Sequence, residues 1–175
     1  MKKPGSITKL RTAVAGLDGA QGRVGWFESA KYPNGAPVAG VAAVQEFGSG
    51  PTPPRSFFRT TAAEKQPAWR TTSEKLAKAV VDGKLPADKM QEALCLSAEG
   101  DVRTKITQIF DPPLSAITLL ARMYRKKGGV VTGKTIGEFA SKADAGPQRI
   151  SGVSHKPLVD SGLMLATLTS QVTKK

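Results

Sequence analysis

The chain has 175 residues, and 26 lysine and arginine residues against 14 aspartate and glutamate residues give it a formal net charge of +12. This length suits one domain with a real core, and the charge favours a polyanion or an acidic protein surface as partner. The sequence contains no run of about 18 apolar residues, the length that a membrane span needs. The single cysteine, Cys95, excludes an intramolecular disulfide, and its apolar surroundings predict a small buried side chain.

The N-terminal part of the chain predicts short elements joined by turns. Residues 1–21 form an arm or helix, because apolar residues recur at spacings of three and four between Ile7 and Leu17; a strand is the alternative, since glycines bracket this segment. Gly22–Ala30 favours a strand, and Tyr32–Gly35 favours a turn because Asn and Gly tolerate the left-handed backbone region. Pro37–Phe47 is predicted to be a short helix.

A proline-rich connector follows this helix. Gly48 ends the helix, and Gly48–Pro54 contains too many glycines and prolines to be helical, which predicts a stiff, extended connector. Arg55–Arg59 then brings two arginines and two aromatic rings to the start of a helix that we expect over Phe57–Val81. Pro67 predicts a kink or a restart within it.

The middle of the chain predicts two more helices and an insertion. Pro86 suits the first turn of a long amphipathic helix that ends at Asp111, before two prolines. Leu114–Tyr124 resumes a helical pattern. The segment of about 126–155 has no clear period and is rich in Gly, Ser, Thr and Lys, so we expect a flexible insertion that orders on assembly.

The C-terminal part predicts the strand that closes the sheet. Leu163–Thr169 is a β-prone segment that we expect to pair with Val24–Phe27, and residues 171–175 form a basic tail. The predicted fold class is α+β: a small, mostly antiparallel sheet packed against two or three helices, with long projecting loops. Residues 22–170 form the single domain.

Three stretches of the sequence resemble one protein family. They are VGWFESAKYPNG (Val24–Gly35), VAAVQEFGSGPTPPRSFFR (Val41–Arg59) and KPLVDSGLMLATL (Lys156–Leu168), and their order matters more than any one of them. Together they resemble the neck and tail-completion proteins of long-tailed bacteriophages. The resemblance implies a structural virion component at the head–tail junction or tail end, without catalytic activity.

Two groups of residues are candidates for contacts with partners. Arg55, Phe57 and Phe58 either pack in the core or form a subunit contact, since Arg and aromatic residues are over-represented in such contacts. Glu46 is expected to pair with Arg55 or Arg59 or to cap a neighbouring element. The subunit-interface candidates are Glu46, Phe47, Pro53, Pro54, Arg55, Phe57, Phe58 and Arg59. The candidates for a DNA-facing wall, with a solvated helix end as the alternative, are Arg122, Arg125, Lys126 and Lys127.

Catalytic chemistry has little support in the sequence. Gly128–Thr135 reads GGVVTGKT, which satisfies the phosphate-binding pattern Gly-x4-Gly-Lys-Thr, but a basic, helix-like segment precedes it where that motif needs a buried strand. His155 is the only histidine and lies in a polar stretch, and the clusters that bind metals are missing. We therefore expect no enzyme, cofactor or metal; a nucleotide-dependent enzyme is the third alternative.

The expected function is structural. We expect copies of the chain to form a ring at the neck or tail end of a tailed phage, which completes the tail, joins it to the head and contacts other neck, connector and tail proteins. Packaged DNA passing through the ring is a further expected contact. The positively charged N-terminus lacks the apolar segment of a secretion signal, so we expect assembly in the host cytoplasm and a final location in the virion. The alternative is a basic nucleic-acid-binding protein.

Overall fold

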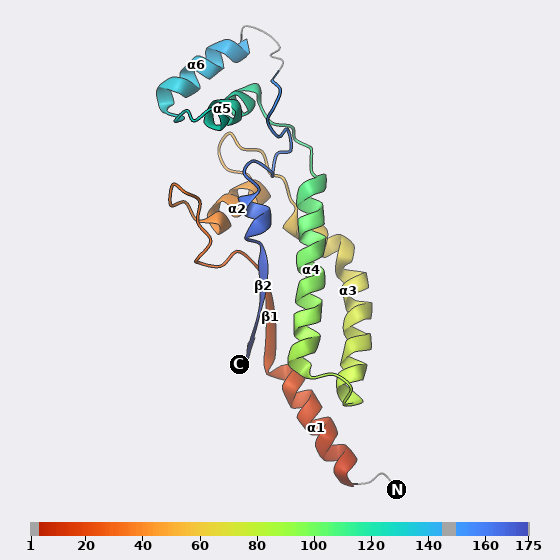
Figure 1. The fold of residues 1–175 in the computed structure, drawn as a ribbon. Coiled ribbons are helices and arrows are strands. Elements are labelled where there is room, and N and C mark those ends of the chain that lie inside the picture. The colour runs from red at the N-terminus through yellow and green to blue at the C-terminus, as the bar shows by residue number, and fades with distance from the viewer. Residues whose placement is uncertain (1–3, 145–149, 175) are drawn as a thin grey trace.

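The fold combines helices with one small sheet in an elongated molecule (Figure 1). The computed structural model describes residues 4–144 and 150–174, and in these ranges it contains seven helices and a two-stranded antiparallel sheet. The predicted α+β class is confirmed. α1 lies at one end of the molecule and α5 and α6 lie at the other.

The N-terminal elements follow the predicted order. α1 (Pro4–Asp18) confirms the helical alternative for the first segment, and β1 (Ala20–Gly25) is a strand that stops well before Ala30. The predicted turn is confirmed by the Gly35 N–H, which donates to the Tyr32 carbonyl at 2.8 Å. α2 (Val38–Phe47) follows.

The connector after α2 differs from the prediction. Gly48 ends the helix with φ 77°, a left-handed conformation that favours glycine. Ser49 and Thr52 then exchange two backbone hydrogen bonds of 3.0 Å, and the Arg55 N–H donates to the Gln45 carbonyl at 2.7 Å. The connector is therefore a closed loop that returns to the end of α2, because backbone hydrogen bonds across it are available despite its prolines.

α3 (Phe58–Val81) and α4 (Ala87–Gln108) form a helical hairpin, the largest part of the body (Figure 1). α3 continues through Pro67 as one helix, so the alternative of a restart there is wrong. Gly83, with φ 74°, lies in the turn between the two helices.

The region after α4 corrects the prediction of an irregular insertion. α5 (Ala116–Lys126) was expected, but α6 (Gly133–Asp144) falls inside the 126–155 segment, of which residues 145–149 lie outside the described residues. The Phe139 ring of α6 is buried and packs edge to face on Tyr124 of α5, with centroids 5.7 Å apart. Two glycines and few apolar residues hide the helical period of α6 in the sequence. The helix itself depends on the packing of Phe139 on α5.

The C-terminal strand is shifted from its predicted position. α7 (Leu163–Ala166) is a helical turn, and β2 (Thr169–Lys174) starts where the predicted strand ends. The predicted pairing of first and last strands is confirmed: β2 is antiparallel to β1, with Gly25 opposite Thr169 and Ala20 opposite Lys174. Residues expected to be a basic tail therefore belong to the sheet up to Lys174.

Two apolar clusters stabilise the molecule. The larger one lies between the sheet, α2, α4 and α7, and the smaller one lies between α5, α6 and the segment after them. The buried residues of the larger cluster are Val38, Ala42, Phe57, Val102, Ile106, Leu158, Met164 and Leu168. Those of the smaller cluster are Leu120, Ala121, Phe139 and Ile150.

Candidate functional site

One buried carboxylate holds the junction between α2 and α3. Glu46 is 4% exposed, and one of its oxygens accepts hydrogen bonds from the N–H groups of Phe57 and Phe58, both at 2.8 Å. The other accepts from the Arg59 N–H at 3.2 Å, Arg59 Nε at 2.9 Å and the Ser56 hydroxyl at 2.7 Å. Because the first N–H groups of a helix have no partner inside it, Glu46 caps α3 from outside that helix. The expectation that Glu46 caps an element and pairs with Arg59 is confirmed.

These contacts change the acidity of Glu46. Burial by itself raises the pKa of a carboxyl group, because the charged form loses its water. Here the hydrogen bonds from the Phe58 amide, the Arg59 side chain, the Ser56 hydroxyl and the Arg59 amide outweigh burial and lower the pKa of Glu46 from 4.5 to about 2. The carboxylate therefore stays charged at neutral pH and is unsuited to acid catalysis there.

Arg55 fixes the other side of the junction. Its side chain is buried and donates from Nε to the Pro112 carbonyl at 2.8 Å and from Nη2 to the Pro113 carbonyl at 3.2 Å. Nη1 donates to the Gln45 side chain at 3.1 Å. Burial lowers the pKa of Arg55. Arg55 thus joins α2 to the segment between α4 and α5.

Trp26 connects the junction to the C-terminal part of the chain. Its ring packs edge to face on Phe57 at 5.9 Å and on Phe58 at 6.1 Å between centroids. Its indole N–H donates to the Met164 carbonyl at 2.8 Å. For Arg55, Phe57 and Phe58 the structure thus favours the core-packing alternative.

Part of the predicted interface set remains on the surface. Phe47 is 63% exposed, and the Arg59 guanidinium lies 4.6 Å from the centroid of its ring, a cation–π contact. We call these two side chains the Phe47–Arg59 patch. Pro54 is exposed as well and Pro53 is half-buried. Glu46, Arg55 and Phe57 are buried within the monomer, so the surface offered to another subunit excludes them.

The predicted DNA-facing residues do not form one surface. Arg122 is 6% exposed and donates from Nη1 to the Ser154, Lys156 and Val159 carbonyls, at 2.7 to 3.1 Å. Nη2 donates to the Pro157 carbonyl at 3.1 Å. Burial lowers the pKa of Arg122. Arg122 is therefore an internal anchor that holds the segment before α7 against α5, which corrects its expected place on a DNA-facing wall.

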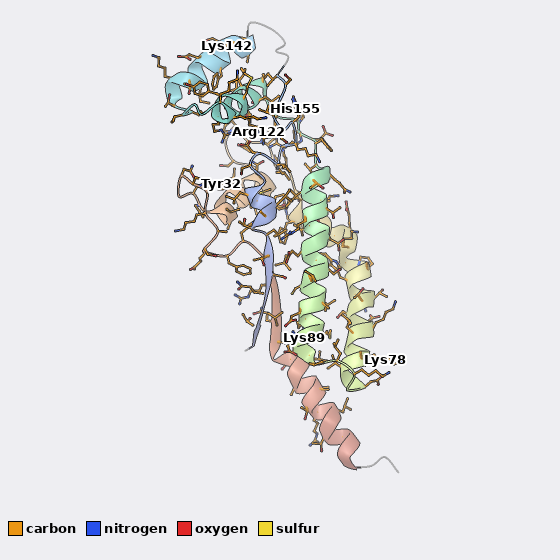
Figure 2. All side chains as sticks on the ribbon, viewed as in Figure 1. Tyr32, Lys78, Lys89, Arg122, Lys142 and His155 are labelled. Carbon is orange, nitrogen blue, oxygen red and sulfur yellow. The ribbon has the colours of Figure 1, made fainter. Side chains whose placement is uncertain are left out.

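The neighbours of Arg122 are more exposed. Arg125 pairs with Asp160 at 2.9 Å, and Lys126 donates to the Gly152 carbonyl at 2.6 Å. Lys127 is exposed at the end of α5. In Figure 2, Lys78 and Lys89 lie near the end of the α3–α4 hairpin, far from Arg122 and Lys142. The cations that the figure labels are thus spread along the molecule.

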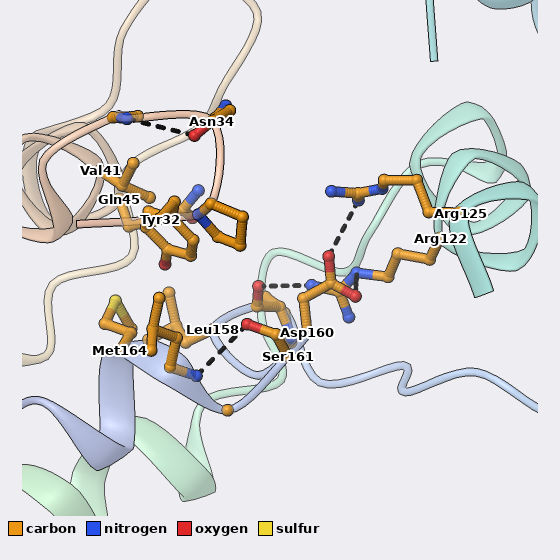
Figure 3. Close-up of a pocket in the computed structure, with 15 residues that line it drawn as sticks. Tyr32, Asn34, Val41, Gln45, Arg122, Arg125, Leu158, Asp160, Ser161 and Met164 are labelled. Carbon is orange, nitrogen blue, oxygen red and sulfur yellow. Dashed lines mark hydrogen bonds and ion pairs between the residues drawn. The ribbon is translucent and has the colours of Figure 1, made fainter. Parts of the chain in front are cut away.

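A cavity of about 550 Å³ lies between the Tyr32–Gly35 turn, α2 and the segment from Pro157 to α7 (Figure 3). Arg122 and Arg125 flank Asp160 at the edge of the cavity. The pKa of Tyr32 is raised, mainly by burial and to a smaller extent by the charge of Asp160. The other lining residues are Pro33, Asn34, Ala36, Val41, Gln45, Pro157, Leu158, Ser161, Gly162, Leu163 and Met164. The sequence predicts the Tyr32–Gly35 turn and the helix α2, but no spacing indicates that they face the segment from Pro157 to α7.

The phosphate-binding pattern lies at the start of α6. Thr132 and Thr135 cap this helix reciprocally: the Thr132 N–H donates to Thr135 Oγ1 at 2.7 Å, and the Thr135 N–H donates to Thr132 Oγ1 at 3.4 Å. A phosphate-binding loop instead needs its amides free and a buried parallel strand in front. In the described residues the one sheet is antiparallel and distant in sequence from this loop.

Comparison with known proteins adds no relative. The chain matches no protein-family model, no curated protein and no solved structure. Within residues 4–144 and 150–174, no helix is long and apolar enough to cross a membrane, and no three His, Cys, Asp or Glu side chains are placed to hold a metal ion.

Proposed function

We propose that this chain is a structural protein of a tailed bacteriophage virion, where copies of it form a ring at the head–tail neck or tail end. The ring completes the tail and joins it to the head, by contact with neck, connector and tail proteins. It makes and breaks no covalent bond. Assembly takes place in the host cytoplasm.

The observation that carries this proposal is the meeting of the three family-like stretches around Trp26. Trp26 belongs to the first stretch, its ring contacts Phe57 and Phe58 of the second, and its N–H donates to the Met164 carbonyl of the third. Up to 138 residues separate these partners in sequence. The three stretches that carry the resemblance therefore meet in one part of the core, and this supports the proposal.

The surface of the monomer supports a role in assembly. The Phe47–Arg59 patch combines an exposed aromatic ring with an arginine, the residue types enriched at the centres of protein interfaces. In this proposal, the loop after α2 and the segment between α5 and α6 project from the body and contact neighbouring subunits. Shape and contact are sufficient for such a role.

Electron microscopy of virions labelled with an antibody against this chain tests the proposal. We expect the label at the head–tail junction or the tail end of every particle. A matched control uses virions treated with antibody that has been pre-absorbed with the purified chain. Purified particles that lack the chain altogether contradict the proposal.

Nucleic-acid binding is the second candidate, because the net charge is +12 and Lys126 and Lys127 lie near each other at the end of α5. It predicts duplex-DNA affinity that falls steeply with salt, with a slope that reports the number of phosphates contacted. A Lys126→Gln/Lys127→Gln variant then has a shallower slope. Weak binding with a slope near that of a neutral protein contradicts this candidate.

A further inference from the structure

α1 carries an apolar stripe that the monomer leaves exposed. Ile7 is 54% exposed, Leu10 is 45% exposed and Val14 is 54% exposed, although their spacing places them on one face of the helix. α1 extends from the body beyond the α3–α4 hairpin (Figure 1). A helix with this pattern normally covers its stripe against another element.

The body of the molecule offers an apolar groove of about 470 Å³. α4 provides Leu94, Cys95 and Ala98 to its lining, and α3 and β1 lie on either side. The remaining lining residues are Gly22, Val24, Gln66, Trp69, Arg70, Ser73 and Gln91. Two helices and a strand that flank an open apolar groove fit a helix laid along it.

The α1 of the same chain is unable to occupy this groove. A single residue, Gly19, separates α1 from β1, and β1 is itself a wall of the groove. The Gly19 N–H donates to the Ala15 carbonyl at 3.1 Å, which continues the helix up to the strand. Reversal of a helix onto the strand that follows it takes a connection of about 2–6 residues. The occupant must therefore come from another molecule.

Charge favours a second copy over a nucleic acid or an acidic protein. Among the residues that the structure describes, Arg70 is the one cation that lines the groove, and Glu74 pairs with it at 3.2 Å. In a chain of net charge +12, an anionic partner is drawn to other surfaces. A groove whose cation is paired and an apolar stripe avoid the repulsion that two strongly basic copies otherwise meet.

We propose that α1 of one copy docks lengthwise in the groove of the next copy, which is the contact that closes the proposed ring. Stripe and groove are different surfaces, so the contact is head-to-tail and propagates until the rotation closes. The lining of the groove runs over 66–73 on α3 and 91–98 on α4, about 10 Å along each helix, so it takes about two turns of the 15-residue α1 and docking buries on the order of 400 Å² in total. This is below the about 1,200 Å² of standard stable interfaces, so one contact is weak. In a closed ring each copy makes it twice.

Light scattering coupled to size-exclusion chromatography tests this inference. We expect the wild type to form a closed oligomer at high concentration and Leu10→Asp to elute as a monomer, with its helix content unchanged by circular dichroism. The matched control is Thr8→Asp, the same charge on α1 but off the stripe, which keeps the wild-type mass. Ala98→Trp fills the groove and also yields a monomer.

Cross-linking tests the contact in a second way. In a Cys95→Ala background, a Val14→Cys/Ser73→Cys variant places one thiol on the stripe and one in the groove. Mild oxidation is expected to give a ladder of disulfide-linked copies, at least tenfold more than a Thr8→Cys/Ser73→Cys control gives. Equal cross-linking in both variants overturns the inference.

The outcomes separate this inference from the proposed function. A wild type that remains monomeric at every concentration and gives no ladder overturns the α1 contact. So does an oligomer whose mass is unchanged in both Leu10→Asp and Ala98→Trp. Either result leaves the virion role standing if the antibody labels the particle. Absence of the chain from virions overturns the virion role but not a stripe-dependent oligomer.

Discussion

At the scale of single residues, Glu46 is the side chain on which the α2–α3 junction depends. It is buried and accepts five hydrogen bonds from Ser56, Phe57, Phe58 and Arg59, two of them from Arg59. We expect Glu46→Gln to lower the free energy of unfolding by about 3 kcal/mol, because the amide leaves helix N–H groups and a guanidinium without a charged acceptor. Urea denaturation measures this loss. Glu74→Gln, in an exposed pair on α3, serves as the control and costs less than about 0.5 kcal/mol.

Glu46 also predicts how stability depends on pH. Its folded-state pKa is about 2, against 4.5 in the unfolded chain, so its stabilisation is present above pH 4.5 and is lost as the pH falls toward 2. The difference corresponds to about 3 kcal/mol. We expect the wild type to lose about that much more stability than Glu46→Gln between pH 5 and pH 2, as measured by urea denaturation at each pH. Parallel curves for the two proteins contradict the assigned pKa.

Residue types and spacing predicted some of these roles and missed others. The capping role of Glu46 was accessible because its partners, Phe57 to Arg59, follow within 13 residues. Arg55 and Arg122 bind backbone carbonyls up to 58 and 37 residues away. A carbonyl has the same chemistry at every residue, so no letter in the sequence indicates which one an arginine binds.

At the scale of elements, the contact between β1 and α4 depends on Gly22. A Cβ added there overlaps Cys95 Sγ on α4, whereas a Cβ added at Gly25 meets nothing. We expect Gly22→Ala to destabilise the protein by about 1–3 kcal/mol, because the strand must move away from the helix. Gly25→Ala on the same strand is the control. Thermal denaturation of both, and of Gly22→Ala/Cys95→Ala, checks the contact; the double variant recovers part of the loss.

The attachment of the segment before α7 depends on Arg122. Its guanidinium donates to four carbonyls between Ser154 and Val159. We expect Arg122→Met to cost about 3 kcal/mol, because four carbonyls, one of them in a buried contact, lose their donor. Hydrogen exchange in residues 152–159 is then faster in the variant than in the wild type, while exchange in α4 changes less. Lys127→Met, at the exposed end of α5, leaves exchange in residues 152–159 unchanged; if it has the same effect, Arg122 is not the anchor.

The elements themselves were predicted best where one period dominates. α3, α4 and α5 have apolar spacings that hold over several turns, and the structure confirms these helices. α6 was missed because its helical face depends on one large residue, Phe139, packing on α5. The last strand was misplaced because Met164 and Leu168, both buried and four residues apart, follow the helical spacing of α7 inside an alternating sequence.

At the scale of the whole molecule, the three family-like stretches form one core, and α1 lies outside it with an exposed stripe. The order of those stretches in the sequence is enough to suggest the proposed function. The cavity beside Asp160 and the groove over α4 were not predictable, because each is lined by segments that only the fold brings together. The sequence also does not show how much apolar surface stays exposed on the folded monomer and is therefore available to a partner.

The most direct test of the central claim is assembly of infectious particles in vitro. Under the proposed function, a phage lysate in which the gene for this chain is disrupted is expected to accumulate filled heads and tails separately. Addition of the purified wild-type chain is expected to join them and to raise the plaque titre by several orders of magnitude, whereas Leu10→Asp restores far less. Complete particles formed without the chain, or a titre that the added protein leaves unchanged, contradict the account.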